Sequence, residues 1–140
     1  MAQPSFNLSV RVYYEDTDAA GVVYYASYLK FLERARTEWL RALGYEQSKL
    51  AQDMGIAFAV RSLAAEYFKP ARLDDMLTVV SSIESLKRAQ LVFAQNVERG
   101  KEVLFTSSVR IACFDSKRGK ATAIPKAINE KFKLLIGNQA

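Results

Sequence analysis

The sequence predicts an α+β fold in which one long helix packs against an antiparallel sheet of five to six strands. Near the N-terminus and in the second half, apolar residues fall at every second position, which is the spacing of strands with one buried face. Between these regions, a single stretch has apolar residues at intervals of three and four positions, which is the spacing of an amphipathic helix. Because one broad apolar helical face needs a covering layer, we expect the sheet to curl around the helix.

The first strand is predicted over residues 6–14, and residues 15–26 connect it to the helix. Its apolar positions share one face: Phe6, Leu8, Val10, Val12 and Tyr14. Ser27 is expected to be the N-cap, because serine hydroxyls accept hydrogen bonds from the first helical amides. The apolar helical spacing then runs up to Gly44, where a C-terminal cap is expected.

Five later segments rich in β-branched and aromatic residues are predicted strands separated by turn sequences. They span residues 57–68, 76–86, 90–98, 103–114 and 120–124. We expect successive strands to form hairpins. Pro125 then opens a short C-terminal helix over residues 126–136. A sheet of this kind has exposed edges, and pairing these edges across a two-fold axis would make a dimer.

The bulk properties predict one domain, residues 1–140, in the cytoplasm. Half of the 140 residues are hydrophobic, an ordinary balance for one globular domain. No apolar run approaches the roughly 18 residues of a membrane span, and the N-terminus lacks the pattern of a signal peptide. Cys113 is the one cysteine, so no internal disulfide can form, which fits a reducing compartment.

The absence of histidine from the sequence narrows the chemistry. It excludes Ser-His-Asp and Cys-His catalysis, and one cysteine cannot supply a zinc cage. We therefore expect no metal and no cofactor, and a carboxylate as the simplest general base, with Lys or Tyr as alternatives. The net charge of +5 favours anionic partners such as nucleic acid, an anionic membrane surface or a phosphorylated ligand, unless it serves solubility alone.

A long motif carries a resemblance to a known family. The stretch "YYEDTDAAGVVYYASYLKFLERARTEWLRALGY", with "YFKPARLDD" and "IACFDSKRGKATAIP" later, resembles the 4-hydroxybenzoyl-CoA thioesterase family of hotdog-fold proteins. The similarity spans about residues 8–128 and is greatest to the acyl-CoA thioesterases associated with the bacterial Tol-Pal system. It implies a sheet wrapped around a central helix, and dimers joined edge to edge, often paired into homotetramers. It also implies sites at the dimer interface that hydrolyse acyl thioesters of coenzyme A or acyl carrier protein.

Thioester hydrolysis needs a group that activates water or attacks the carbonyl, and donors that stabilise the charge growing on the carbonyl oxygen. Free amides at a helix N-terminus can be such donors. The family comparison selects Asp18 as the catalytic carboxylate, acting as base or nucleophile, where spacing alone would favour a turn cap or a solvated charge. Asp16 is expected to hold the loop, and Glu15 to be a surface charge or a structural partner.

Position 25 departs from the Tol-Pal branch, which usually has histidine there. The 4-hydroxybenzoyl branch has an aromatic residue at this position and uses its backbone N–H on the thioester oxygen. The resemblance therefore assigns Tyr25 a catalytic role through its main chain. The alternative is that its ring only packs at the start of the helix, and both can hold at once.

Further residues are candidates for substrate binding. Tyr14 matches a tyrosine near the site of the Tol-Pal branch, but by alternation it belongs to the core, where its hydroxyl would need a partner such as Asp18. Gly21 lies in the flexible turn after Asp18. Arg61 and Ser62 lie where the family runs its ligand along a subunit edge. Two basic hairpin tips, Lys87-Arg88 and residues 117–120, could bind the phosphates of coenzyme A, or be ordinary solvated turns.

Two other functions compete with an acyl-CoA thioesterase. A non-catalytic hotdog protein could bind acyl carriers or cell-envelope partners, although the intact motif around Asp18 argues against this reading. A nucleic-acid binder is suggested by charge alone, and the sequence lacks a recognisable motif for it, so we expect no nucleic-acid partner.

Overall fold

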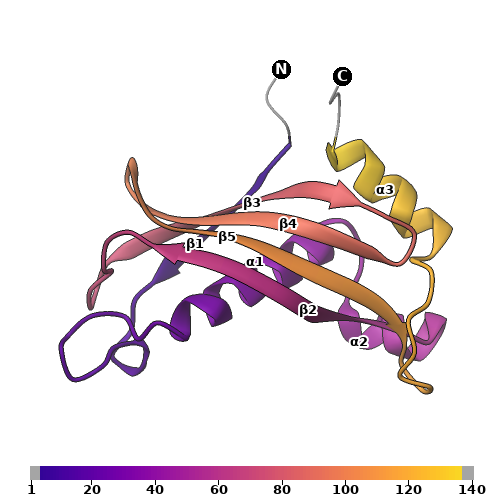
Figure 1. Cartoon of the computed structure of the whole chain (residues 1–140), viewed down its shortest axis with the longest axis horizontal. Helices are drawn as coiled ribbons and strands as arrows, with labels where there is room; N and C mark the ends of the chain where they lie inside the picture. The colour runs from indigo at the N-terminus through magenta and orange to yellow at the C-terminus, as the bar shows by residue number, and fades with distance from the viewer. Residues whose placement is uncertain (1–3, 137–140) are drawn as a thin grey trace.

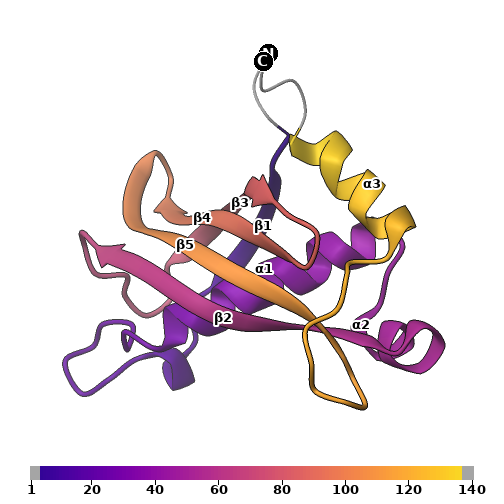
Figure 2. The same ribbon diagram turned by 45° about the vertical axis from the view of Figure 1, so that its right-hand side comes forward.

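The computed structural model describes residues 4–136, which form one antiparallel sheet wrapped around a helix (Figures 1 and 2). The strands are β1 (Phe6–Arg11), β2 (Ile56–Tyr67), β3 (Met76–Leu86), β4 (Gln90–Arg99) and β5 (Glu102–Asp115). Their order across the sheet is β1-β3-β4-β5-β2. The helices are α1 (Ser27–Ala42), the short α2 (Gln47–Lys49), which a π-helical turn (Leu50–Met54) follows, and α3 (Lys126–Ile136).

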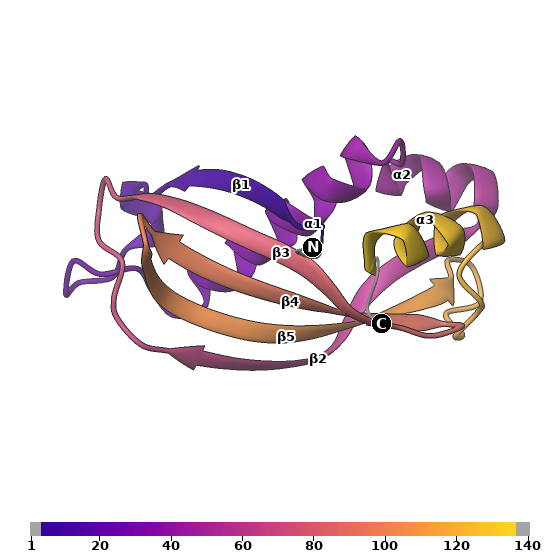
Figure 3. The same cartoon turned by 90° about the horizontal axis from the view of Figure 1, so that it is seen from above.

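The core lies between α1 and the inner face of the sheet (Figure 3). The helix buries one stripe of side chains: Tyr28, Phe31, Leu32, Ala35, Trp39 and Leu40. Alternate residues of β3, β4 and β5 are buried against them, as a half-buried strand requires. The predicted α+β fold, with a sheet curling around one long helix, is confirmed.

Three predictions about the sheet are wrong. The first strand ends at Arg11, because the amide of Tyr13 donates to the Asp16 carboxylate (2.8 Å) and the chain turns into a short 3₁₀ helix. Residues 120–124 form no strand; Ala121 makes one isolated bridge to Phe114. β2 pairs with β5 rather than with β3, because residues 68–75 carry the chain across to the other side of the sheet.

The ends of α1 correct one prediction and confirm another. Ser27 is not the N-cap but the first helical residue, because its amide donates to the Tyr24 carbonyl and Ala26 occupies the cap position. At the other end, Gly44 has φ +100°, a left-handed conformation that glycine adopts without strain. It follows the C-cap Leu43, so it terminates the helix as predicted.

A polar contact crosses the centre of the apolar core. The fully buried Gln95 of β4 donates from Nε2 to the Leu32 carbonyl of α1 (3.1 Å) and to Ser81 Oγ of β3 (2.9 Å). Its Oε1 accepts a hydrogen bond from Arg36 (2.9 Å). These bonds fix the position of α1 over the sheet, because an unsatisfied amide at this depth would be costly.

Candidate active site

The loop before α1 is a tight reversal that begins at Asp18. Thr17 and Val23 bridge, the Asp18 amide donates to the Val22 carbonyl (2.9 Å), and the Gly21 amide donates back to the Asp18 carbonyl (3.0 Å). Gly21 has φ +80°, the conformation that makes the reversal possible without strain. The Asp18 side chain is exposed, and its Oδ1 accepts a hydrogen bond from the Ala20 amide (2.9 Å). One carboxylate oxygen is therefore held, and the other is free to meet a ligand.

Asp16 anchors both ends of this loop. Its side chain is buried, with Oδ2 accepting from the Tyr13 amide, while its backbone carbonyl accepts from the Tyr24 amide (2.9 Å). The expectation that Asp16 holds the loop is confirmed. Glu15 beside it is exposed, as a surface charge would be.

Residues 68–75, the crossing segment, support the loop through backbone contacts with its second half. Its buried Ala71 accepts a hydrogen bond from the Val23 amide (2.8 Å) and donates its own amide to Tyr28 Oη of α1 (3.1 Å). Val22 also bridges to Arg72. The loop and the start of α1 therefore share one support.

Arg99 of β4 holds the crossing segment in place. One of its N–H groups donates to the Asp75 carboxylate (2.8 Å) and to the Pro70 carbonyl (3.3 Å). Asp75 also accepts from the Arg72 amide (2.8 Å). Burial alone would raise the pKa of Asp75, but the hydrogen bonds from Arg72 and Arg99 outweigh it and hold this pKa below its ordinary range.

Tyr25 presents its main chain at the start of α1. Its carbonyl accepts a hydrogen bond from Tyr67 Oη at the end of β2 (2.9 Å), and its ring is exposed beside that of Tyr24, with centroids 4.7 Å apart. Within residues 4–136, no acceptor takes its amide N–H. This amide lies two residues ahead of α1, at the positive end of the helix dipole, so it is able to stabilise an oxyanion.

Tyr67 is itself fixed by an aromatic cluster. Its ring meets those of Tyr28 and Phe105 edge to face, at centroid distances of 5.3 Å and 4.9 Å, and Tyr28 stacks on Phe105 at 5.1 Å. The position of the Tyr25 peptide therefore depends on side chains from α1, β2 and β5.

The structure does not gather the other predicted binding residues at Asp18. Tyr14 is 82% exposed on the 3₁₀ turn, so its predicted place in the core is wrong, and no hydrogen bond joins it to Asp18. Arg61 and Ser62 lie at the irregularity in the middle of β2. Arg88 follows the end of β3 that lies away from the loop, roughly 33 Å along an eleven-residue strand.

Sequence reasoning missed three residues that hold the loop: Tyr67, Ala71 and Arg99. Two of them lie in or beside the noted "YFKPARLDD" segment, but the contact from Tyr67 to Tyr25 spans 42 residues. No local pattern reveals a pairing at that separation. Cys113 is no competing nucleophile, because burial raises the pKa of its thiol to about 11.

The described residues offer neither a metal site nor a membrane span. Between residues 4 and 136, no three acidic or cysteine side chains gather where they could hold a metal ion. Within the same residues, no helix combines the length and the hydropathy needed to cross a membrane.

Comparisons with known proteins indicate one family. The model of the thioesterase-like superfamily matches residues 12–132. The acyl-CoA thioesterase YbgC of Haemophilus influenzae is 44% identical over 132 residues, covering 94% of this chain and 97% of that protein. The acyl-CoA thioester hydrolase YbgC of Escherichia coli O6:H1 is 46% identical over 129 residues, covering 91% and 96%. A probable thioesterase from Bartonella henselae superimposes with a TM-score of 0.83 at 36% identity, covering 86% of this chain and 99% of that one.

The loop support can be tested through Arg99. Arg99→Met should release the crossing segment, so hydrogen exchange at the Val23 amide should become faster. Because the pKa of Asp75 is lowered in the folded state, its contribution to stability is present above the ordinary value of about 3.9 and is lost as pH falls through the lowered pKa. The difference in unfolding free energy between wild type and variant should therefore shrink in acid.

The matched control is Arg41→Met, which removes an exposed ion pair with Glu38 on α1. It should leave exchange at Val23 unchanged, and Arg99→Lys should restore part of the protection. Unaltered exchange at Val23 in Arg99→Met would show that the segment is held by other contacts.

Proposed function

Because this chain belongs to the thioesterase-like superfamily and is 44–46% identical to YbgC acyl-CoA thioesterases over more than nine-tenths of its length, we propose that it hydrolyses acyl-CoA thioesters to free acid and coenzyme A. The observation that carries the assignment is this near full-length similarity. The free amide at the start of α1 and the open carboxylate of Asp18, on one supported loop, supply the two chemical elements that thioester hydrolysis needs.

In the proposed reaction, Asp18 acts as general base towards water or as nucleophile towards the carbonyl carbon. In either case negative charge grows on the thioester oxygen, and the Tyr25 amide donates to it. Tyr67 holds the Tyr25 residue through its carbonyl, so the donor is oriented before the substrate arrives. The thiol of coenzyme A leaves when the tetrahedral intermediate collapses.

The active unit is a dimer paired along β2. Among residues 4–136, no strand pairs with the outer edge of β2, and its inward-facing Val60 and Leu63 are 51% and 40% exposed. A long, apolar, open edge of this kind is an interface or an aggregation hazard. The other open edge, β1, is only six residues long, so it is less suited to pairing. A tetramer would form by association of two such dimers.

Pairing two β2 edges about a two-fold axis runs them antiparallel, so the Tyr67 end of one strand lies beside the Phe58 end of the other. The end of the sheet that holds Arg88 then approaches the catalytic loop of the second copy. Arg88 and three lysines, Lys87, Lys126 and Lys133, line a groove of about 610 Å³ at that end. We assign this groove to the phosphates of coenzyme A, or to an acidic acyl carrier protein that delivers the same thioester.

The motif around Asp18 supports placement near the Tol-Pal-associated branch, while the aromatic Tyr25 is shared with the 4-hydroxybenzoyl branch. We infer a cytoplasmic enzyme, since the single cysteine is buried and free. A non-catalytic role as a binder of acyl carriers is disfavoured by the open Asp18 carboxylate.

The activity and the role of Asp18 are tested together. The wild-type protein should release free thiol from a panel of short, long and aromatic acyl-CoAs. Asp18→Asn should lower kcat by about 10²–10⁴-fold, the contribution of a positioned base, with an unchanged melting temperature. The matched control Glu15→Gln should keep nearly full turnover. Acyl-CoA binding without thiol release would favour the non-catalytic reading, and a fully active Asp18→Asn would exclude the assigned residue.

The role of the Tyr25 main chain predicts a contrast between two tyrosines. Tyr25→Phe keeps the amide and should retain activity within roughly tenfold. Tyr67→Phe removes the hydroxyl that holds the Tyr25 carbonyl, so kcat should fall more than in Tyr25→Phe, by up to about 100-fold for a misplaced group. The reverse order of the two variants would make the Tyr25 hydroxyl itself catalytic.

The β2 interface predicts that Leu63→Arg produces monomers and abolishes activity at the same protein concentrations. Sedimentation velocity and thiol release measure both effects. The control is Leu134→Arg, which places the same charge at a leucine of α3 that is 77% exposed. An active monomer would contradict the dimeric site.

A further inference from the structure

A second cavity lies beside α1, on the flank that faces β2. Its volume is about 330 Å³, within the range of small-ligand pockets. Its walls are mainly apolar and come from α1, from the three strands β2, β4 and β5, and from α3: Leu40, Phe58, Leu91, Phe93, Ile111 and Phe132. Such walls favour a hydrocarbon group. Because apolar walls discriminate little between hydrocarbon groups, the polar residues at the rim decide which group binds.

One of these polar residues is Arg36, a largely buried cation with unused donors. Its Nη1 donates to Gln95 Oε1 (2.9 Å), and within residues 4–136 no carboxylate forms an ion pair with it. No described side-chain nitrogen is both fully buried and without a partner, so the Arg36 nitrogens that have no partner are accessible to solvent, and Arg36 lines the cavity. A guanidinium has five donors in a fixed planar fork, which matches a carboxylate.

Gln95 fixes the position of Arg36. Gln95 is fully buried, and its Nε2 donates to both Leu32 and Ser81, so its Oε1 is not free to turn away from Arg36. Burial lowers the pKa of Arg36, and the exposed Glu33 at the rim partly offsets this effect. The pocket is thus apolar, small and equipped with one preorganised cation.

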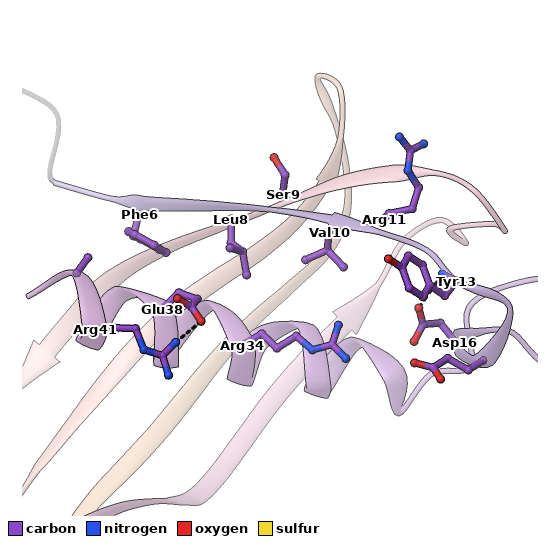
Figure 4. A pocket seen from close by; sticks show the side chains of 12 residues that line it. Phe6, Leu8, Ser9, Val10, Arg11, Tyr13, Asp16, Arg34, Glu38 and Arg41 are labelled. Atoms are coloured by element: carbon purple, nitrogen blue, oxygen red, sulfur yellow. Dashed lines mark hydrogen bonds and ion pairs between the residues drawn. The ribbon is translucent and has the colours of Figure 1, made fainter. Parts of the chain in front are cut away.

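The opposite flank of α1 provides a contrast. Figure 4 shows Arg34 in the groove between α1 and β1, together with Glu38 and Arg41. Arg34 is exposed, and that groove contains acidic and basic side chains in equal number. Arg34 is therefore a solvated surface charge on the same helix, which makes it a matched control for Arg36.

We propose that this cavity receives the distal end of the acyl group, and that Arg36 makes the enzyme prefer acyl groups that end in a carboxylate. The proposal rests on the proposed function and on β2 pairing, which brings the cavity beside the catalytic loop of the second copy. The hydrocarbon part of the acyl group contacts the aromatic walls, and the terminal carboxylate accepts hydrogen bonds from the free N–H groups of Arg36. Glu33 at the rim is solvated, so its repulsion is screened.

The test compares two eight-carbon substrates, octanoyl-CoA and suberoyl-CoA, which differ by the terminal carboxylate. Wild type should show a higher kcat/KM for suberoyl-CoA. Arg36→Met should reduce this preference by at least about tenfold, the value of one hydrogen bond to a charged group, mainly by removing the advantage of suberoyl-CoA. Arg36→Lys should keep part of the preference, and Arg34→Met should keep all of it.

A second measurement does not depend on any variant folding. Suberate should inhibit the wild-type enzyme at lower concentration than octanoate does. The proposal is overturned if wild type has equal kcat/KM for octanoyl-CoA and suberoyl-CoA, or if Arg36→Met keeps the preference. The thioesterase function stands in either case. A side chain of the second copy that fills the cavity would give this result. If no acyl-CoA releases thiol, the proposed function fails and the inference fails with it.

Discussion

The two backbone groups of Ala71 connect the parts of the molecule that must stay in register. Its carbonyl takes the Val23 amide from the loop, and its amide is taken by Tyr28 of α1. Both bonds are shielded from water, because Ala71 is fully buried, and so each is stronger than it would be at the surface. Ala71 therefore joins the loop that contains Asp18, the start of α1 and the crossing segment.

The sheet covers the two sides of α1 unequally. The edge assigned to the dimer and the cavity beside Arg36 both lie on the less covered side. On the side towards β1 the edge strand has six residues, while β2, at the other edge, has twelve residues and exposed apolar side chains. The open side contains the edge that we assign to the dimer and the cavity that Arg36 lines. Within one chain the basic groove and the loop of Asp18 lie at opposite ends of the sheet, and the proposed dimer brings the groove of one copy beside the loop of the other.

Periodicity predicts those helices and strands that have one face in the core and the other face in solvent. The bounds of β3 and α3 agree with the predicted 76–86 and 126–136, and Gly44 terminates α1 as expected, directly after the C-cap Leu43. Strand pairing was not predictable this way, because the apolar face of β2 fits either neighbour and only the crossing segment decides. Tyr14 continues the alternation in the sequence, but the strand has already ended, because the Tyr13 amide donates to the Asp16 carboxylate and not to a neighbouring strand. Arg36 was hidden because an arginine on a helical face resembles any solvated charge until Gln95, 59 residues later, is found beneath it.

The place of β2 at the far side of β5 has a consequence during synthesis on the ribosome. Ile56 pairs with Asp115, so β2 is made first and waits for almost sixty further residues before it finds its neighbour. Contacts this distant in sequence form late, and β3 and β4, the two strands between them in sequence, can pair while β2 is still unpaired. The edge that we assign to the dimer is therefore the last to become ordered. Until β5 is complete, both edges of the apolar β2 are open to other nascent chains, so late pairing prolongs the exposure of this strand.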